Sequence, residues 1–293
     1  MKLQSHKEIT ADFGPKYLLH EHLAIADPPR DLSVLHASEL TKESPEFCAR
    51  ERAFHFAHGD RRTSEFLGTA TNVTYQWGRW VEHSIRNHWL RGYAIGHWTC
   101  RLCEHEHQYQ TVPAKCEGCE AHGDYLEYIE PRATCQKTGA SCGLDLLMWR
   151  NNMLTIVEIK SIDKDQFKEL LAPMAEHGRR TKFYIDLLGN SEWTNFDVNL
   201  NLDFAYVLYV CKAYGFKDDY EGRQGISDTV CSPFKEYKVK AATKKSDLKP
   251  VYDRAKEWNK FVETGKLPKR HVCPTPMCKR AEKCEYRKEC FNQ

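Results

Sequence analysis

The stretch Gly143–Lys160, GLDLLMWRNNMLTIVEIK, decides how this chain folds. It consists of two apolar, strand-like runs on either side of an Asn-Asn pair at 151–152. Asparagine tolerates the positive φ that a two-residue hairpin turn requires, so we expect the pair to connect two antiparallel strands. With Arg150 placed opposite Met153 beside the turn, the register of every other cross-strand pair follows.

This register brings charged side chains onto one face of the hairpin. Asp145 then lies opposite Glu158, with the two Cβ atoms about 5 Å apart. Lys160 shares the face of Glu158, whereas Val157 and Ile159 point to the other face, into a core. Facing carboxylates repel each other unless a cation lies between them, which suits Mg²⁺, and a lysine beside such a site can orient a metal-bound water. The alternative is a surface hairpin with ordinary solvated charges.

The segments around the hairpin predict an α/β fold with a mixed central sheet flanked by helices. Apolar residues at helical spacing indicate three long helices, and the tryptophans of the first, Trp77, Trp80 and Trp89, are expected in the core. The helices are expected at about 71–90, at 163–188 with an interruption near Pro173, and at 247–264. The strands are expected at 125–129, 143–149, 153–160, 204–213 and 234–241.

Composition and charge exclude several classes of protein. Hydrophobic residues make up 41% of the chain and charged residues 29%, which excludes low-complexity disorder, collagen and coiled coil. With 43 basic and 41 acidic residues, any binding of nucleic acid must come from local patches. The longest apolar run, 204–211, is far shorter than the ~20 residues that span a bilayer, so no membrane partner is expected. Residues 1–12 lack the apolar segment of a secretory signal, which predicts a cytoplasmic protein.

Eight of the thirteen cysteines fall into two groups, and clustered thiols in a reducing compartment are typically metal ligands. The spacing C-x2-C-x12-C-x2-C of the first group is typical of a zinc ribbon. We expect it to bind Zn²⁺ in a structural role, with substrate contact as a second possibility. Thiolates of the second group suit zinc and iron–sulfur alike. The ribbon cluster is Cys100, Cys103, Cys116 and Cys119, and the tail cluster is Cys273, Cys278, Cys284 and Cys290.

Asp145 followed by Glu158-Ile-Lys160 resembles the core motif of the PD-(D/E)XK nuclease superfamily. The resemblance is to its RecB-like, CRISPR-adaptation-type branch of iron–sulfur exonucleases, which includes phage-type members. It runs from about residue 38 to 290 and leaves out the ribbon cluster. The supporting motifs, in matching order, are Ser38-Glu-Leu40, Cys48-Ala-Arg50, Gly78-Arg-Trp-Val-Glu82-His83, His177-Gly-Arg-Arg180-Thr-Lys-Phe-Tyr184, Tyr209-Val-Cys-Lys212 and the cysteine tail.

The resemblance implies a metal-dependent DNA exonuclease that hydrolyses phosphodiester bonds in DNA recombination, repair or phage DNA processing. Such a protein would act on linear or single-stranded DNA ends in a bacterial or phage-infected host cytoplasm. Two alternatives stay open. One is a non-catalytic, metal-stabilised DNA-binding or adaptor protein. The other is a CRISPR-adaptation-type nuclease that trims DNA ends for a recombination or integrase partner.

The resemblance also implies roles for individual residues. Asp145, Glu158, the carbonyl group of Ile159 and Glu82 would hold Mg²⁺ or Mn²⁺, and Lys160 would orient the attacking water. At the helix position, Glu82 and His83 compete for the metal, and Glu82 is favoured because it stands four residues after Gly78. Tyr184 and Arg180, which stands where the family usually has glutamine, would contact the DNA backbone.

The family pattern places a 4Fe-4S cluster on one N-terminal cysteine and three cysteines of the tail. This implies Cys48, Cys278, Cys284 and Cys290 as ligands, with Cys273 as the alternative to Cys278, and a clasp that joins the two ends of the chain. The expected organisation is an N-terminal helical part (1–96), an inserted zinc-ribbon module (97–121), a PD-(D/E)XK catalytic core (122–265) and an iron–sulfur tail (266–293).

Overall fold

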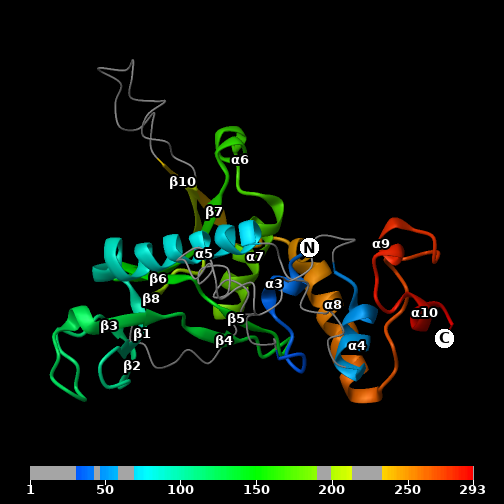
Figure 1. The fold of residues 1–293 in the computed structure, drawn as a ribbon, viewed down its shortest axis with the longest axis horizontal. Helices are drawn as coiled ribbons and strands as arrows, with labels where there is room; N and C mark the ends of the chain where they lie inside the picture. The colour runs from blue at the N-terminus through cyan, green and yellow to red at the C-terminus, as the bar shows by residue number, and fades with distance from the viewer. Residues whose placement is uncertain (1–30, 43–46, 59–68, 190–198, 213–232, 293) are drawn as a thin grey trace, which may run out of the picture.

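The computed structural model describes residues 31–42, 47–58, 69–189, 199–212 and 233–292. Its centre is a five-stranded mixed sheet in the order β10-β9-β7-β6, with the short β8 beside β7 (Figure 1). β7 runs parallel to β9 and antiparallel to β6. The predicted α/β class is therefore confirmed. The strands are β6 (Leu146–Arg150), β7 (Met153–Ile162), β8 (Asn199–Leu200), β9 (Phe204–Cys211) and β10 (Phe234–Lys240).

The hairpin has the register that the sequence predicts. Arg150 pairs with Met153, and the two turn asparagines have φ values of 53° and 59°. The strand predicted over 143–149 is interrupted, however. β5 (Ser141–Gly143) pairs with β4 (Arg132–Thr134), and the ladder between β6 and β7 begins only at Leu146. Asp145 thus stands in a gap between two strands.

Helices cover one face of the central sheet. Strand alternation points Leu154 and Ile156 to this face, where they join a core with Phe183 of α7 and Trp258 of α8. The predicted interruption near Pro173 is present, because α6 ends before it and α7 begins after it. The helices are α3 (Ala37–Leu40), α4 (Ala49–His58), α6 (Lys164–Glu169), α7 (Ala175–Leu188) and α8 (Lys245–Thr264).

A second, three-stranded sheet and the helix α5 (Thr69–Ser84) cover the opposite face. The sheet has the order β2-β1-β3 and consists of β1 (Ile95–Cys100), β2 (Glu106–Thr111) and β3 (Leu126–Ile129). Trp98 and Tyr128 of this sheet share a core with Ile159 of β7 and Val81 of α5. The boundaries predicted at 97 and 121 fall inside this sheet, which is packed into the body of the protein.

The prediction that Trp77, Trp80 and Trp89 are core residues is wrong. Their exposed fractions are 47%, 55% and 56%, and the rings of Trp77 and Trp80 stack on each other with centroids 5.3 Å apart. The apolar side that α5 buries is instead formed by Val81 and by Ile85, in the π-helical turn Ile85–Trp89 that continues the helix. Helical spacing of tryptophans alone does not tell which side of a helix faces the core.

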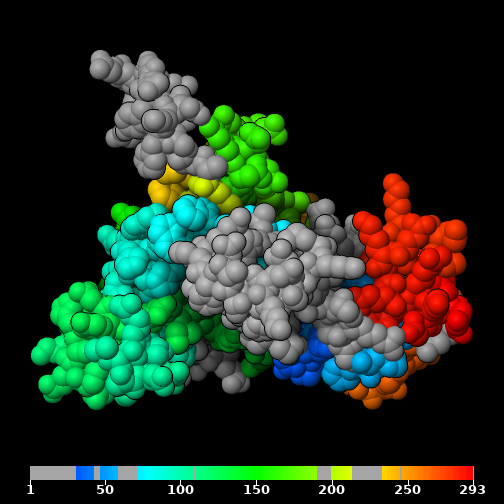
Figure 2. Space-filling view, viewed as in Figure 1, coloured from blue at the N-terminus to red at the C-terminus, as the bar shows by residue number. Residues whose placement is uncertain are grey.

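The two cysteine-rich regions lie at opposite ends of the longest axis of the molecule (Figures 1 and 2). The three-stranded sheet with the ribbon cluster occupies one end, and the tail with the short helices α9 (Lys279–Glu282) and α10 (Arg287–Phe291) occupies the other. The hairpin β6–β7 lies between them. No helix in the described part of the chain is both long and apolar enough to cross a membrane.

Candidate metal centres

At the hairpin, three oxygen atoms converge on the ammonium group of Lys160. Lys160 Nζ lies 3.1 Å from Asp145 Oδ2, 3.0 Å from Glu158 Oε1 and 2.8 Å from the carbonyl oxygen of Ile159. Burial alone would lower the pKa of Lys160, but the charges of Asp145 and Glu158 raise it overall. The structure thus brings together the two carboxylates, the carbonyl and the lysine that the sequence singles out.

The gap between β5 and β6 is what positions Asp145. Its Oδ2 accepts a hydrogen bond from the backbone N–H of Ile159 at 2.8 Å. The aspartate side chain therefore takes the place of a partner strand's carbonyl group, as short polar side chains do where a ladder stops. Because Ile159 belongs to β7, this hydrogen bond fixes the Asp145 carboxylate beside Glu158.

Glu158 is buried, with an exposed fraction of 1%. Its Oε1 contacts Lys160 and, at 3.2 Å, Arg180 Nη1, whereas its buried Oε2 has no hydrogen-bond partner in the described structure. Burial and, next, the charge of Asp145 raise the pKa of Glu158. An orphaned buried carboxylate oxygen costs free energy until a cation or a proton reaches it. The alternative of an ordinary surface hairpin does not fit this burial.

Of the two candidates on α5, the structure favours Glu82. Burial, followed by the charge of Asp145, raises the pKa of Glu82 to about 7, so the two carboxylates are close enough to repel. His83 faces the other way, with Nδ1 3.1 Å from Glu127 Oε1. α5 approaches β7 closely at Gly78, where a Cβ atom would lie 2.9 Å from Ser161 Oγ. A small residue at 78 therefore lets the helix carry Glu82 to the site.

The structure does not support direct DNA contacts for the two residues expected to make them. Tyr184, on the buried side of α7, is 5% exposed and packs in the core. Arg180 is engaged with carboxylates, because Nη1 contacts Glu158 and Nη2 contacts Glu176. Both residues lie at the site, but each faces inward.

Arg86 and His177 complete the surroundings, and no role was predicted for either of them. Arg86, one turn after Glu82, pairs with Glu130, and its Nη1 lies 3.4 Å from the carbonyl oxygen of Asp145. His177 contacts the Tyr209 hydroxyl at 2.8 Å, and burial, then Lys160 and Arg180, lower its pKa to about 4. The spacing of Arg86 from Glu82 is the one sequence signal that could have identified it.

The ribbon cluster is assembled as predicted. The sulfur atoms of its four cysteines all lie within 4.8 Å of one another, so this group could hold a metal ion. Cys100 Sγ is 3.7 Å from Cys119 Sγ, and Cys103 Sγ is 3.5 Å from Cys116 Sγ. Cys100 and Cys116 are buried, while Cys103 and Cys119 are exposed.

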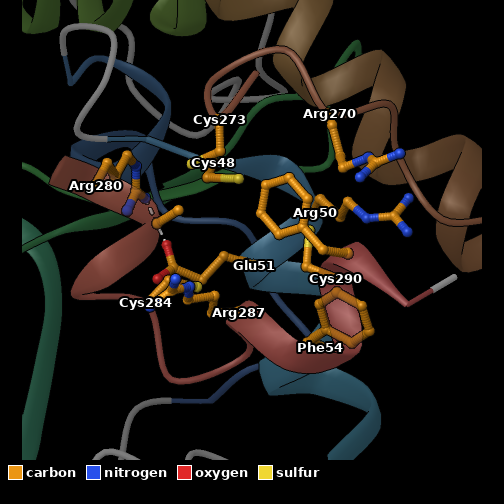
Figure 3. A pocket seen from close by; sticks show the side chains of 12 residues that line it. Cys48, Arg50, Glu51, Phe54, Arg270, Cys273, Arg280, Cys284, Arg287 and Cys290 are labelled. Carbon is orange, nitrogen blue, oxygen red and sulfur yellow. Dashed lines mark hydrogen bonds and ion pairs between the residues drawn. The ribbon is translucent and has the colours of Figure 1, made fainter. Parts of the chain in front are cut away.

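The tail cluster is arranged differently, with three of its four cysteines around a cavity (Figure 3). Cys284 and Cys290 line it together with Cys48 from the start of α4, so cysteines from both ends of the chain meet as predicted. Cys273, the alternative ligand, also lines the cavity. Cys278 is outside its lining, and Cys278 Sγ accepts a hydrogen bond from the backbone N–H of Ala281 at 3.4 Å.

Several contacts join α4 to the tail around this cavity. Arg280 Nη2 lies 2.6 Å from Glu51 Oε2, and the ring of Tyr286 stacks on Phe54 with centroids 5.5 Å apart. Arg50 Nη1 donates a hydrogen bond to the carbonyl oxygen of Pro268 at 2.9 Å. The cavity therefore lies at a junction between two segments that are distant in the sequence.

Comparisons with known proteins add little to this geometry. No family model matches the chain, and no curated protein matches it. Among solved structures, one described as "Crystal structure of SSO0001" is 13% identical, and the alignment covers 90% of this chain and 95% of that chain. Its TM-score is 0.38, which carries no argument about fold or function.

Proposed function

We propose that this protein is a metal-dependent DNA nuclease, an exonuclease with a PD-(D/E)XK core, that hydrolyses phosphodiester bonds at DNA ends. The observation that carries the proposal is the convergence of Asp145 Oδ2, Glu158 Oε1 and the Ile159 carbonyl oxygen on one cationic group, 2.8–3.1 Å away. Oxygen donors of this kind are what Mg²⁺ and Mn²⁺ take.

The residues present fit a divalent cation. Glu158 Oε2 is buried and orphaned, and the pKa values of Glu158 and Glu82 are raised, as expected where carboxylates crowd together without enough positive charge. Asp145, Glu158, Glu82 and the Ile159 carbonyl group would hold the ion. A bound Mg²⁺ or Mn²⁺ lowers the pKa of a coordinated water and stabilises charge on the phosphate.

The protein's own groups would orient and restrain the reactants. Lys160, whose ammonium group already bridges the two carboxylates, would position the nucleophilic water by hydrogen bonding. Arg180 holds Glu158 from the side of α7 and keeps its carboxylate directed at Lys160. Arg86 contributes positive charge behind Asp145 and Glu130. Electrostatic positioning of this kind is the main contribution that proteins make to phosphoryl transfer.

Zinc is the proposed occupant of the ribbon cluster. With Zn–S bonds of about 2.3 Å, a tetrahedral site separates its sulfur atoms by about 3.8 Å. The observed separations of 3.7 Å and 3.5 Å are close to this value. Its proposed role is to stabilise the two cysteine-bearing turns at the end of this sheet.

An iron–sulfur cluster is the proposed occupant of the tail cavity. Four arginines line the cavity with the cysteines, and their charge would offset a thiolate-ligated, anionic cluster. The arginines are Arg50, Arg270, Arg280 and Arg287.

The test is degradation of end-labelled linear DNA beside a closed circle, with Mg²⁺ or Mn²⁺. We expect wild type to consume only the linear DNA and Lys160→Ala to lose at least about 100-fold in rate, since general acid–base and orienting groups contribute about 10²–10⁴. Lys164→Ala, a lysine in the next helix, is the matched control and should keep wild-type activity.

Two results would contradict the proposal in different ways. If folded, metal-loaded wild type leaves both DNAs intact, the protein is not a nuclease, and a DNA-binding or adaptor role becomes the hypothesis to test by equilibrium binding. If both substrates are cut and Lys160→Ala is as active as wild type, the chemistry lies elsewhere in the molecule.

A further inference from the structure

A second group of metal-ligating side chains lies beside the ribbon cluster. His105 follows Cys103 in the turn between β1 and β2, His107 belongs to β2, and Glu117 follows Cys116. One ligand atom from each of these three residues lies within 4.8 Å of the other two. The group shares no residue with the four cysteines.

His107 points to a ligand because it is buried and incompletely satisfied. Its exposed fraction is 3%, and its Nε2 has no hydrogen-bond partner in the described residues. A buried ring nitrogen without a partner loses its hydration and gains no hydrogen bond in return. Coordination of a cation by the ring would compensate for this loss, and neutral imidazole is the most common metal ligand among side chains.

The other two side chains can close around an ion with little movement. His105 Nε2 is 4.0 Å from Glu117 Oε2, and the two histidine rings meet edge to face with centroids 4.8 Å apart. A tetrahedral zinc site with bonds of about 2.1 Å separates its ligand atoms by about 3.4 Å. The side chain of Glu117 is 73% exposed, so it is free to move by the difference.

Gly118 allows this arrangement next to the cysteines. A Cβ atom at 118 would lie 2.8 Å from the Cβ of His105 and 3.2 Å from Cys103 Sγ. Only glycine lets the histidine pack so closely against the turn. Four thiolates on one dication leave a local charge of −2, which favours a second cation nearby.

From these contacts we infer that His105, His107 and Glu117 form a second metal site, which binds a borderline divalent transition metal such as Zn²⁺. Two imidazoles and one carboxylate leave a coordination position open, which distinguishes this site from the closed four-cysteine site. The inference does not depend on nuclease activity or on the occupant of the tail cavity.

The test is a Zn²⁺ titration of full-length protein whose ribbon cluster is already loaded with zinc. The ring nitrogens of the histidines are followed by ¹H–¹⁵N NMR. We expect the signals of His105 and His107 to change and to saturate at one added equivalent of Zn²⁺. The signal of His122, an exposed histidine of the same region whose Nδ1 is 3.1 Å from Asp124 Oδ2, should stay constant over that range.

Variants separate a metal site from a pair of packed rings. Glu117→Gln should raise the Zn²⁺ concentration needed for half-saturation by at least about tenfold, since even outer-shell partners affect affinity by 10–100-fold. Glu106→Gln, the same change of charge on a neighbouring residue outside the group, should behave as wild type. The inference fails if wild type shows no change at His105 and His107 up to millimolar Zn²⁺, or if Glu117→Gln titrates as wild type does.

Discussion

The cysteine side chains are arranged differently at the two cysteine-rich ends of this molecule. In the ribbon cluster the sulfur atoms lie within 4.8 Å of one another, while three tail cysteines line a cavity together with Cys48. The ribbon end also has an apolar anchor, because Trp98 and Leu126 are buried in a core shared with α5 and β7. The tail buries Ala281 and Tyr286, but neither belongs to the cores that flank the central sheet, and α10 has no buried residue.

This difference predicts how much each end would depend on the metal proposed for it. A segment with an apolar anchor loses only local order when its metal is removed, because the core still fixes its strands. A segment that depends on ligands for its position loses that position with them. The tail should therefore be the more metal-dependent end.

The largest effect is expected from Cys284→Ser in the tail. Losing one thiolate should release the proposed cluster and free the tail from α4, because structural metal sites contribute apparent binding free energies of about 10–16 kcal/mol. We expect iron and sulfide contents to fall below one tenth of wild type and the Tm to drop by about 10 °C or more. Cys211→Ala, in a core away from the cavity, should retain the metal.

A smaller but still large effect is expected from Trp98→Ala in the ribbon end. Trp98 is fully buried, and replacing such a residue by alanine costs about 3–5 kcal/mol. Urea unfolding should show this loss with zinc still bound. If the stability is unchanged, the ribbon end is an independent module and our comparison of the two ends fails.

Cys103→Ser should cost less than Trp98→Ala, although it removes a ligand. Cys103 is exposed, so the substitution creates no cavity, and the apolar anchor stays in place. We expect loss of zinc, faster amide exchange limited to about 100–122, and a global destabilisation of about 2 kcal/mol or less. Destabilisation as large as that of Cys284→Ser would show that both ends depend equally on metal.

The smallest effect is expected from His177→Gln, in the region between the two ends. The pKa of His177 is lowered to about 4 in the folded protein, from 6.5. Its contribution to stability is therefore complete above pH 6.5 and is lost as the pH falls toward 4. Between pH 7 and pH 5, His177→Gln should lose about 1–2 kcal/mol less stability than wild type in urea unfolding. Equal losses in the two proteins would show that His177 titrates normally.

Much of the central fold could be predicted from the sequence because the residues that determine it are close to one another along the chain. The Asn-Asn turn sets the register, and alternation along β7 then separates Glu158 and Lys160 from the core residues Val157 and Ile159. The gap at Asp145 could not be predicted in this way. It depends on the pairing of β5 with β4, a choice that the hairpin's own residues do not determine.

The environments of side chains on the helices were harder to predict. Tyr184 and Arg180 belong to a helix motif that reaches the site, but whether they face outward depends on how α7 packs on the sheet and on Glu176. Similarly, α5 has tryptophans and aliphatic residues at helical spacing, and only the position of the second sheet decides that Val81 and Ile85 are buried. Tertiary packing determined these outcomes.

The π-helical turn at the end of α5 has a mechanical consequence. Asn87 in this turn accepts a hydrogen bond from the backbone N–H of Tyr128 at 2.6 Å, and Arg86 pairs with Glu130 directly after β3. The same helix carries Glu82 to the carboxylates. α5 and its π-helical turn thus connect the three-stranded sheet with the carboxylate site. Any tilt of the three-stranded sheet must either break these two contacts or shift Glu82 relative to Asp145.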